Sequence, residues 1–285
     1  MAEHLAAADP RAGRWSDTGT LQLAMPARQL ADAPLTIRVR GVPIGAALVL
    51  RLSARWWSGE QLVSSARYRS VDGTIDVSRD APLEGYAGVD ADGLLRTLVP
   101  ISPPDATGGG RRGASGAVPT TRAGPAADVL EVCARIDAPD ATCVSSTTRR
   151  DALGPTVATA ALPLPGGAAT LYRERERTPD GPAVVAVPLL DRAPAERAAA
   201  LLASHGYVVL SLAAWTTGVH LSTVETTLLR AAEQALSRTV SRELSPTVLL
   251  GLDLTPDRRS AAATEAWSGL LDRLRDLRVA PSPPR

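Results

Sequence analysis

Hydrophobic periodicity changes once along this 285-residue chain, and the change constrains the fold more than any other feature. From Leu21 to Pro100, apolar and polar residues alternate in short runs between Gly, Pro and Asp breaks; the runs are Leu35 to Val39, Ala46 to Leu52, Leu62 to Tyr68 and Gly73 to Val77. Period-two runs at this spacing predict an antiparallel β-sandwich. We therefore expect an immunoglobulin-like sandwich over residues 18–154, after a disordered tail at 1–17.

A glycine- and proline-rich stretch interrupts the predicted sandwich at residues 102–127, and its composition predicts a flexible loop. Two further strand-like runs, Val129 to Ile136 and Thr142 to Arg149, predict a hairpin that places Cys133 and Cys143 about opposite each other. A regulatory disulfide is then conceivable. Two reduced, small core residues are the favoured interpretation, because cysteines stay reduced in a cytoplasmic protein.

Continuous apolar runs dominate the chain after Pro155. The strand-like runs there are Val157 to Leu162, Ala168 to Arg173, Val184 to Leu190, Val208 to Ala213 and Thr247 to Leu252. A helical segment follows each of the last three runs, which is typical of a parallel sheet covered on both faces. Residues 155–280 are therefore predicted to form a three-layer α/β domain, with 281–285 as a tail.

Helix start and stop signals support this interpretation. Pro194 suits a first helical turn, Gly206 suits a C-terminal stop, and Ser222 to Glu225 has the capping-box pattern. Thr255-Pro256 is predicted to open the last helix. The apolar face of that helix is expected to consist of Trp267, Leu270, Leu271, Leu274 and Leu277.

Composition excludes several classes of function. The 31 basic and 30 acidic residues give a net charge of +1, so we expect no nucleic-acid partner and no anionic membrane partner. Neither an apolar run of membrane-spanning length nor a signal peptide is found, so the predicted localisation is cytoplasmic. Two Cys and three His residues favour no metal site, and no cofactor is implied. Lys and Asn are absent, which indicates a GC-rich bacterial coding sequence and removes Schiff-base chemistry.

A long ordered motif lies in the predicted sandwich. The run Ser65 to Asp80, read as S-A-R-Y-R-S-V-D-G-T-I-D-V-S-R-D, continues to Gly85-Tyr86-Ala87-Gly88 and then to Gly93-Leu94-Leu95. This stretch resembles the N-terminal domain of the acyl-CoA thioester hydrolase / bile acid-CoA:amino acid N-acyltransferase family, except that Ala91-Asp92 replaces a Pro-Met pair. The resemblance implies a sandwich followed by an α/β-hydrolase domain that acts on acyl thioesters.

The resemblance also implies a nucleophile elbow, a tight strand-to-helix turn of the form G-x-S-x-G, or with Cys in this family. The corresponding residues here are Gly251-Leu252-Asp253-Leu254-Thr255, so Asp253 stands at the nucleophile position. The turn that would supply an oxyanion-hole amide, Pro188 to Arg192, contains no glycine. Since 32 residues follow Asp253, we expect the Asp and His of a Ser/Cys-His-Asp triad to be missing.

Polar residues follow each of the three predicted parallel strands, at the sheet edge where open α/β sheets bind ligands. The catalytic candidates are Asp253, His220 and Asp191, and the substrate-binding candidates are Arg192, Trp215, Thr216, Thr217 and Thr255. The field at a helix start favours the carboxylate of Asp253 and the neutral imidazole of His220, so the two could form an acid–base pair. The alternatives are that Asp253 only stabilises backbone amides before a helix and that His220 is a solvated loop residue.

Three functional hypotheses follow. In the first, a divergent thioesterase or acyltransferase-family protein without the triad binds a hydrophobic acyl or polyketide-like metabolite of bacterial specialised metabolism. It would transform this ligand by cofactor-independent proton transfer, as in a cyclisation, dehydration or isomerisation. In the second, the chain is a pseudoenzyme that binds an acyl ligand or serves an active partner. In the third, Asp253 activates a water for residual acyl-thioester hydrolysis.

The run Thr247 to Leu252 is expected to be an edge strand, because few residues remain to cover it. An apolar edge strand is a pairing hazard unless something covers it. We therefore predict a homodimer or a partner protein across this edge, or a fold-back of the chain's own loop or tail.

Overall fold

The computed structural model describes most of the chain between Thr20 and Val279. The described residues are 20–101, 127–138, 141–164, 167–175, 183–188, 192–212, 226–239, 247–252 and 258–279.

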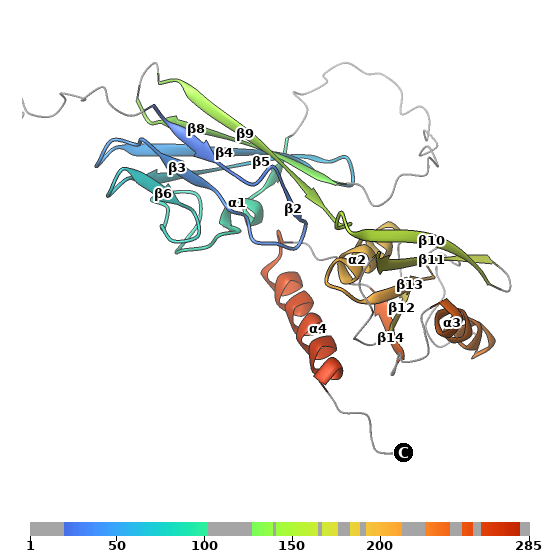
Figure 1. The fold of residues 1–285 in the computed structure, drawn as a ribbon. Helices are drawn as coiled ribbons and strands as arrows, with labels where there is room; N and C mark the ends of the chain where they lie inside the picture. The colour runs from blue at the N-terminus through green and yellow to red at the C-terminus, as the bar shows by residue number, and fades with distance from the viewer. Residues whose placement is uncertain are drawn as a thin grey trace, which may run out of the picture.

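The N-terminal unit contains two sheets (Figure 1). The larger sheet runs in the order β2 (Arg28–Leu30), β9 (Cys143–Asp151), β8 (Asp128–Ile136), β4 (Ala47–Arg55), β5 (Gln61–Arg69) and β7 (Val99–Pro100). The smaller sheet runs in the order β1 (Gln22–Ala24), β3 (Arg38–Arg40) and β6 (Thr74–Asp76). All neighbouring strands are antiparallel except β2 and β9, which are parallel.

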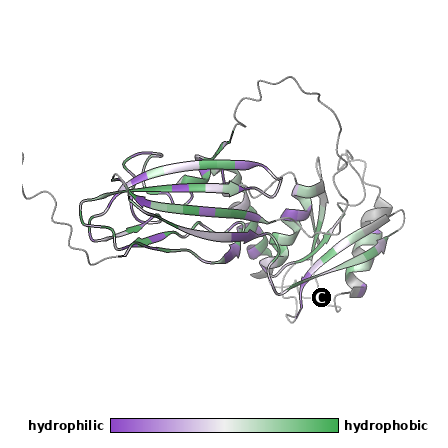
Figure 2. Ribbon diagram, turned by 90° about the horizontal axis from the view of Figure 1, so that it is seen from above, coloured by the Kyte–Doolittle hydropathy of each residue, from purple (hydrophilic) through white to green (hydrophobic). Residues whose placement is uncertain are grey.

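Alternation of residue type along the long strands creates one buried and one outward face. In β4 the even-numbered residues are buried and the odd-numbered residues are exposed or half-buried, and β5 and β8 follow the same rule apart from the last residue of β8. Figure 2 shows this alternation as changes between hydrophilic and hydrophobic colour along the strands. Val39 and Ile75 of the smaller sheet share one core with Leu50 of β4 and Leu130 of β8, so the two sheets pack face to face.

The second unit is built on a five-stranded sheet. Its order is β10 (Val157–Leu164), β11 (Gly167–Glu174), β13 (Val208–Ser211), β12 (Ala183–Pro188) and β14 (Thr247–Leu252). The pairs β10–β11 and β11–β13 are antiparallel, whereas β12 pairs in parallel with both β13 and β14. A strand-rich N-terminal unit followed by an α/β unit is therefore confirmed.

Helices cover both faces of the five-stranded sheet. Helix α2 (Arg192–Ser204) packs its alanines, among them Ala198, against Val184 and Val209. Helix α3 (Thr226–Thr239) packs Ala232 and Leu236 on the opposite face, against residues such as Val185. Alternate residues of β12 thus point to different layers, which is why this strand reads as a continuous apolar run.

The last helix, α4 (Ala261–Val279), begins later than the sequence predicted. Arg258, Arg259 and Ser260 precede it in non-helical conformation, and the Ser260 hydroxyl accepts a hydrogen bond of 3.2 Å from the Ala263 N–H. The start signal at Thr255-Pro256 was therefore wrong, because Ser260 provides the cap.

The predicted apolar face of α4 is confirmed over most of its length. Trp267 and Leu274 are buried in the same core as α2, and Leu270 and Leu271 pack against that core. Leu277 is 39% exposed, so the buried stripe ends before the last predicted position.

The predicted hairpin of Cys133 and Cys143 is present as β8 and β9, but the cysteines are not reduced core residues. The register pairs Cys133 with Ser145 and Cys143 with Arg135, so the cysteines are diagonal neighbours, and a disulfide joins them. Both lie at odd-numbered, outward-facing positions; Cys143 is exposed and Cys133 is half-buried. The prediction of reduced core cysteines was wrong because it rested on the expected cytoplasmic compartment. The alternation along the two strands, which places both cysteines on the outward face, was not used.

Candidate functional site

The three parallel strands of the second unit end side by side. Ala186 of β12 pairs with Ser211, the last residue of β13, and Pro188 at the end of β12 pairs with Leu252, the last residue of β14. The Leu212 N–H continues this contact with a hydrogen bond of 2.9 Å to the Ala186 carbonyl. The chain segments that follow these strands therefore leave from one edge, the carboxyl edge of the sheet, where open α/β sheets hold ligands.

The residues predicted for the site follow these strand ends in the sequence. Arg192 is the first residue of α2, but its side chain lies outside the described part of the chain. The other candidates also fall outside the described residues; they are Asp191, Trp215, Thr216, Thr217, His220, Asp253 and Thr255. That these residues lie close together remains a prediction. The described backbone shows that the strands preceding them end at the same edge of the sheet.

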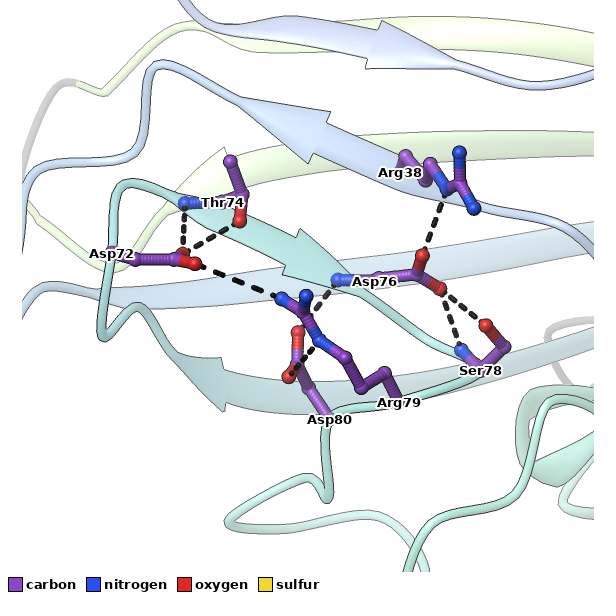
Figure 3. A network of polar contacts seen from close by, with 7 residues as sticks. All are labelled: Arg38, Asp72, Thr74, Asp76, Ser78, Arg79 and Asp80. Atoms are coloured by element: carbon purple, nitrogen blue, oxygen red, sulfur yellow. Dashed lines mark hydrogen bonds and ion pairs between the residues drawn. The ribbon is translucent and has the colours of Figure 1, made fainter.

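The motif Asp72-Gly73-Thr74 in the sandwich forms a tight turn before β6 (Figure 3). One carboxylate oxygen of Asp72 accepts hydrogen bonds from the Thr74 N–H at 3.0 Å and from the Thr74 hydroxyl at 2.6 Å. These hydrogen bonds lower the pKa of Asp72 below its usual value. Gly73 has a φ of 87°, a conformation that glycine adopts without strain. The carboxylate of Asp72 is therefore used by the turn itself.

Asp76 has the same kind of role at the end of β6. It accepts hydrogen bonds from the Ser78 N–H at 3.0 Å, the Ser78 hydroxyl at 2.6 Å and the Arg38 Nε at 2.8 Å. Its own N–H donates to Asp80 at 2.7 Å. Partial burial would raise the pKa of Asp76, but the hydrogen bonds from Ser78 and the contact with Arg38 lower it overall. This network joins β3 to β6 and uses the acidic residues of the family-like motif for folding (Figure 3).

The glycines of the motif's second half permit close packing around Tyr86. A Cβ atom on Gly93 would lie 2.3 Å from the Tyr86 ring, and a Cβ on Gly85 would lie 2.6 Å from the Ser65 carbonyl oxygen. The Tyr86 hydroxyl is hydrogen-bonded to that of Tyr68, which is fully buried. Burial, followed by the interaction with Tyr86, raises the pKa of Tyr68 well above its usual value. Helix α1 (Gly93–Arg96) is thereby fixed against β5.

Buried polar contacts join the N-terminal unit to the α/β unit. Asp32 lies 5% exposed with its carboxylate 2.6 Å from His205 Nε2, just after α2, and accepts a hydrogen bond of 2.8 Å from Trp267 Nε1 of α4. Burial would raise the pKa of Asp32, but the contacts with His205 and Trp267 lower it overall. One carboxylate of the sandwich thus binds two elements of the second unit.

Asp92 makes the second contact between the units. Its Oδ2 accepts hydrogen bonds from Arg258 at 2.7 Å through Nε and lies 2.6 Å from the Nη2 of the same guanidinium. Its Oδ1 accepts the Leu35 N–H at 3.1 Å. Asp92 is part of the Ala91-Asp92 pair that departs from the family pattern, and the departure supplies a carboxylate that binds Arg258.

The third contact lies deepest. Asp128 and Arg197 of α2 have side chains only 1% and 3% exposed, and their charged groups are 2.6 Å apart. The second oxygen of Asp128 accepts the Trp57 N–H at 3.0 Å, and the Arg197 guanidinium lies 5.8 Å from the Trp57 ring centroid. Burial raises the pKa of Asp128 despite the nearby positive charges of Arg197 and Arg150.

Arg150 of β9 lies beside this pair and is fully buried. Its Nη2 donates to the carbonyl oxygens of Ala31 and, at 2.9 Å, Ala33. Burial lowers its pKa to about 10, although Asp128 and Asp92 act in the opposite direction. These interface residues were not predicted from the sequence. For Arg150 the alternation of β9 was an available signal, since it places this residue on the buried face.

Two surface hollows lie on the sandwich and away from the carboxyl edge. One, of about 290 Å³, lies over the network of Figure 3 and is lined by residues such as Arg40 and Arg79. The other, of about 400 Å³, lies over β4, β5 and β8 and is lined by residues such as Arg55 and Val129. Across the described residues no group of acidic, His and Cys side chains has the geometry of a metal site, and no described helix is long and apolar enough to cross a membrane.

Comparison with known families agrees with the motif in the sandwich. Residues 32–160 match the family described as the acyl-CoA thioester hydrolase/BAAT N-terminal region; this range contains β3 to β9 and the start of β10. This match confirms the resemblance to the family over residues 32–160. No curated protein matches the chain.

Proposed function

We propose that this chain is a divergent member of the acyl-CoA thioesterase/acyltransferase family that binds a hydrophobic acyl or polyketide-like metabolite at the carboxyl edge of β12, β13 and β14. The family match supports the acyl ligand class. The sheet supports the place: an antiparallel lead-in of β10 and β11 followed by three parallel strands with α2 and α3 on opposite faces is consistent with an α/β-hydrolase-like sheet. The two facing sheets of the first unit support the immunoglobulin-like description.

The chemistry we propose is proton transfer by Asp253 without a Ser/Cys-His-Asp triad. One observation carries this proposal: β14 stays in register with β12 through the pair Pro188 and Leu252, so Asp253 is the first residue beyond the paired strand. Asp191 follows Pro188, the last residue of β12, by three positions in the sequence. His220 would complete an acid–base pair from the segment after β13. Such a set of groups can move a proton on an acyl ligand in a cyclisation, dehydration or isomerisation without a cofactor.

The test begins with the ligand. Small molecules that co-purify with the chain are identified by mass spectrometry, and the best candidate is offered to the wild type and to Asp253→Asn. Removal of a general acid or base is expected to lower turnover by about 10²- to 10⁴-fold. Asp272→Asn is the matched control, because this exposed carboxylate of α4 forms a surface ion pair with its neighbour Arg275. Equal turnover by wild type and Asp253→Asn would rule out the carboxylate mechanism.

The same experiment separates the alternatives. A ligand that binds wild type tightly but is returned unchanged would make the chain a pseudoenzyme or a binding subunit. Release of free thiol from acyl-CoA, abolished in Asp253→Asn, would instead identify residual thioester hydrolysis.

We also propose that β14 pairs with a second copy or with a partner. In the described sheet β14 is the outermost strand beside β12. A monomeric mass by light scattering at micromolar concentration, together with rapid hydrogen exchange along β14, would contradict this proposal.

A further inference from the structure

The disulfide between Cys133 and Cys143 lies on the outward face of the six-stranded sheet. This face carries the odd-numbered residues of β4, β5, β8 and β9, and both cysteines have odd numbers. Cys143 is exposed and Cys133 is half-buried, so the disulfide is accessible from solvent. Accessibility is the first requirement for thiol–disulfide exchange.

Two arginines flank the disulfide on the same face. Arg51 of β4 is the cross-strand partner of Cys133, and Arg135 of β8 is the cross-strand partner of Cys143. Directly paired residues in antiparallel strands have Cβ atoms about 5 Å apart, so both guanidinium groups can reach the sulfur atoms. Both arginines are exposed and, among the described residues, neither forms an ion pair.

Few carboxylates on this face compensate the positive charge near the disulfide. Glu131 lies two residues before Cys133 on the same face. Asp137, just beyond β8, lies 2.7 Å from Arg67, and Asp151 binds Arg149 at the far end of β9. The disulfide is therefore an electropositive, solvent-accessible site, which is the environment typical of reactive cysteines.

We propose that Cys133–Cys143 is an exchange site for small anionic thiols. The thiolate of the incoming molecule attacks Sγ of the exposed Cys143, and a new sulfur–sulfur bond forms there as the bond between the two cysteines breaks. The electron pair of the broken bond stays on Sγ of Cys133, which leaves as a thiolate, and the incoming thiol has lost its proton to solvent. No further oxidant or reductant is needed.

Arg51 and Arg135 favour this reaction at two points. They attract an anionic thiolate to the face, and they stabilise the leaving Cys133 thiolate, which lowers the barrier because a more stable thiolate leaves faster. The inference is independent of the chemistry proposed for Asp253, because the disulfide belongs to the N-terminal unit and the carboxyl edge belongs to the five-stranded sheet.

The test uses the full chain with its disulfide intact and four probes: glutathione and coenzyme A, which are anionic, 2-mercaptoethanol, which is neutral, and cysteamine, which is cationic. Mixed-disulfide formation is followed by intact mass spectrometry, and each rate constant is expressed per thiolate. The anionic thiols are expected to react roughly three- to tenfold faster than cysteamine at low salt. This preference is expected to shrink in 0.5 M salt, because ions screen exposed charges.

Peptide mapping after trapping with iodoacetamide locates the two sulfurs. The adduct is expected on Cys143 and the trapped thiol on Cys133, in agreement with their exposures. Arg51→Ala and Arg135→Ala together are expected to remove the preference for anionic thiols. Arg55→Ala with Arg69→Ala is the matched control: these are exposed arginines of the same face, and neither is a cross-strand partner of a cysteine.

Equal thiolate rate constants for glutathione and cysteamine would overturn the proposal, as would an adduct chiefly on Cys133. Two free, alkylatable cysteines in protein purified without reductant would overturn it as well. Loss of the preference in the control pair but not in the Arg51 and Arg135 pair would show that the general charge of the face, and not the two flanking arginines, is responsible.

Discussion

The β-sandwich and the α/β unit use their acidic residues in different ways. In the sandwich, Asp72 and Asp76 of the family-like motif accept hydrogen bonds from residues two positions further along the chain and so hold turns. In the α/β unit, Asp253 and Asp191 come after strands that end at one edge of a sheet. The residues that identify the family are therefore those that build its fold, whereas the candidates for chemistry lie in the other unit.

The largest effect is expected where the two units meet. Asp128→Ala removes the buried carboxylate that binds Arg197 and lies near Arg150, and breaking a buried ion pair from one side costs about 3–5 kcal/mol. Urea denaturation of the whole chain measures this loss. Asp272→Ala in the exposed pair with Arg275 should cost no more than about 0.5 kcal/mol. If Asp128→Ala lowered the free energy of unfolding no more than Asp272→Ala does, the buried contact between the units would not stabilise the fold.

Substitution of a motif glycine tests whether the motif is needed for packing of the sandwich. Gly93→Ala places a Cβ 2.3 Å from the Tyr86 ring, so overpacking should destabilise the sandwich by about 1–3 kcal/mol. Gly269→Ala in α4 meets no atom within 4 Å and should stabilise the chain by up to about 1 kcal/mol. Thermal unfolding compares the two variants. A neutral Gly93→Ala would show that this motif glycine is not required for packing.

Acid should weaken the contact of Asp32 with His205 and Trp267. The pKa of Asp32 in the folded chain lies below the usual 3.8, so its contribution is present above about pH 4 and is lost as pH falls through the folded-state pKa. Asp32→Asn should therefore be less stable than wild type by about 1–2 kcal/mol at pH 7, and the difference should close in acid. Burial instead raises the pKa of Asp128, so protonation of this carboxylate should favour the folded state as the pH falls. Denaturation midpoints between pH 2 and 7 provide the measurement; a constant difference would contradict the assignment.

The smallest effect concerns Tyr68 and Tyr86. The pKa of Tyr68 is raised above its usual 10, so the folded state resists ionisation and stability should fall as pH rises above about 10. Tyr68→Phe loses one hydrogen bond, about 1 kcal/mol at pH 7, and should show a shallower alkaline decline. Unfolding curves of wild type and Tyr68→Phe, measured at pH 8 and at pH 11, test this prediction. If Tyr68→Phe lost stability with rising pH as steeply as wild type, Tyr68 would not be the source of the alkaline sensitivity.

Strands could be predicted from the sequence because their signals are local. The run Thr247 to Leu252 coincides with β14, and the alternation of β4 and β5 fixed which residues form the core. The contact of Asp92 with Arg258 spans 166 residues and leaves no periodic signal in the sequence. The strand ends of the candidate site could likewise be predicted, whereas the meeting of its side chains depends on segments between strands that follow no period.

We have proposed that Asp253 performs the chemistry, whereas the motif of the sandwich builds the fold. Turnover of the identified acyl ligand, measured per folded molecule in Asp72→Ala and Asp253→Asn, tests it most directly. We expect Asp72→Ala to be less stable but to retain wild-type turnover, and Asp253→Asn to be as stable as wild type but to lose turnover by about 10²-fold or more. Wild-type turnover in Asp253→Asn, or loss of turnover in folded Asp72→Ala, would contradict this division of roles.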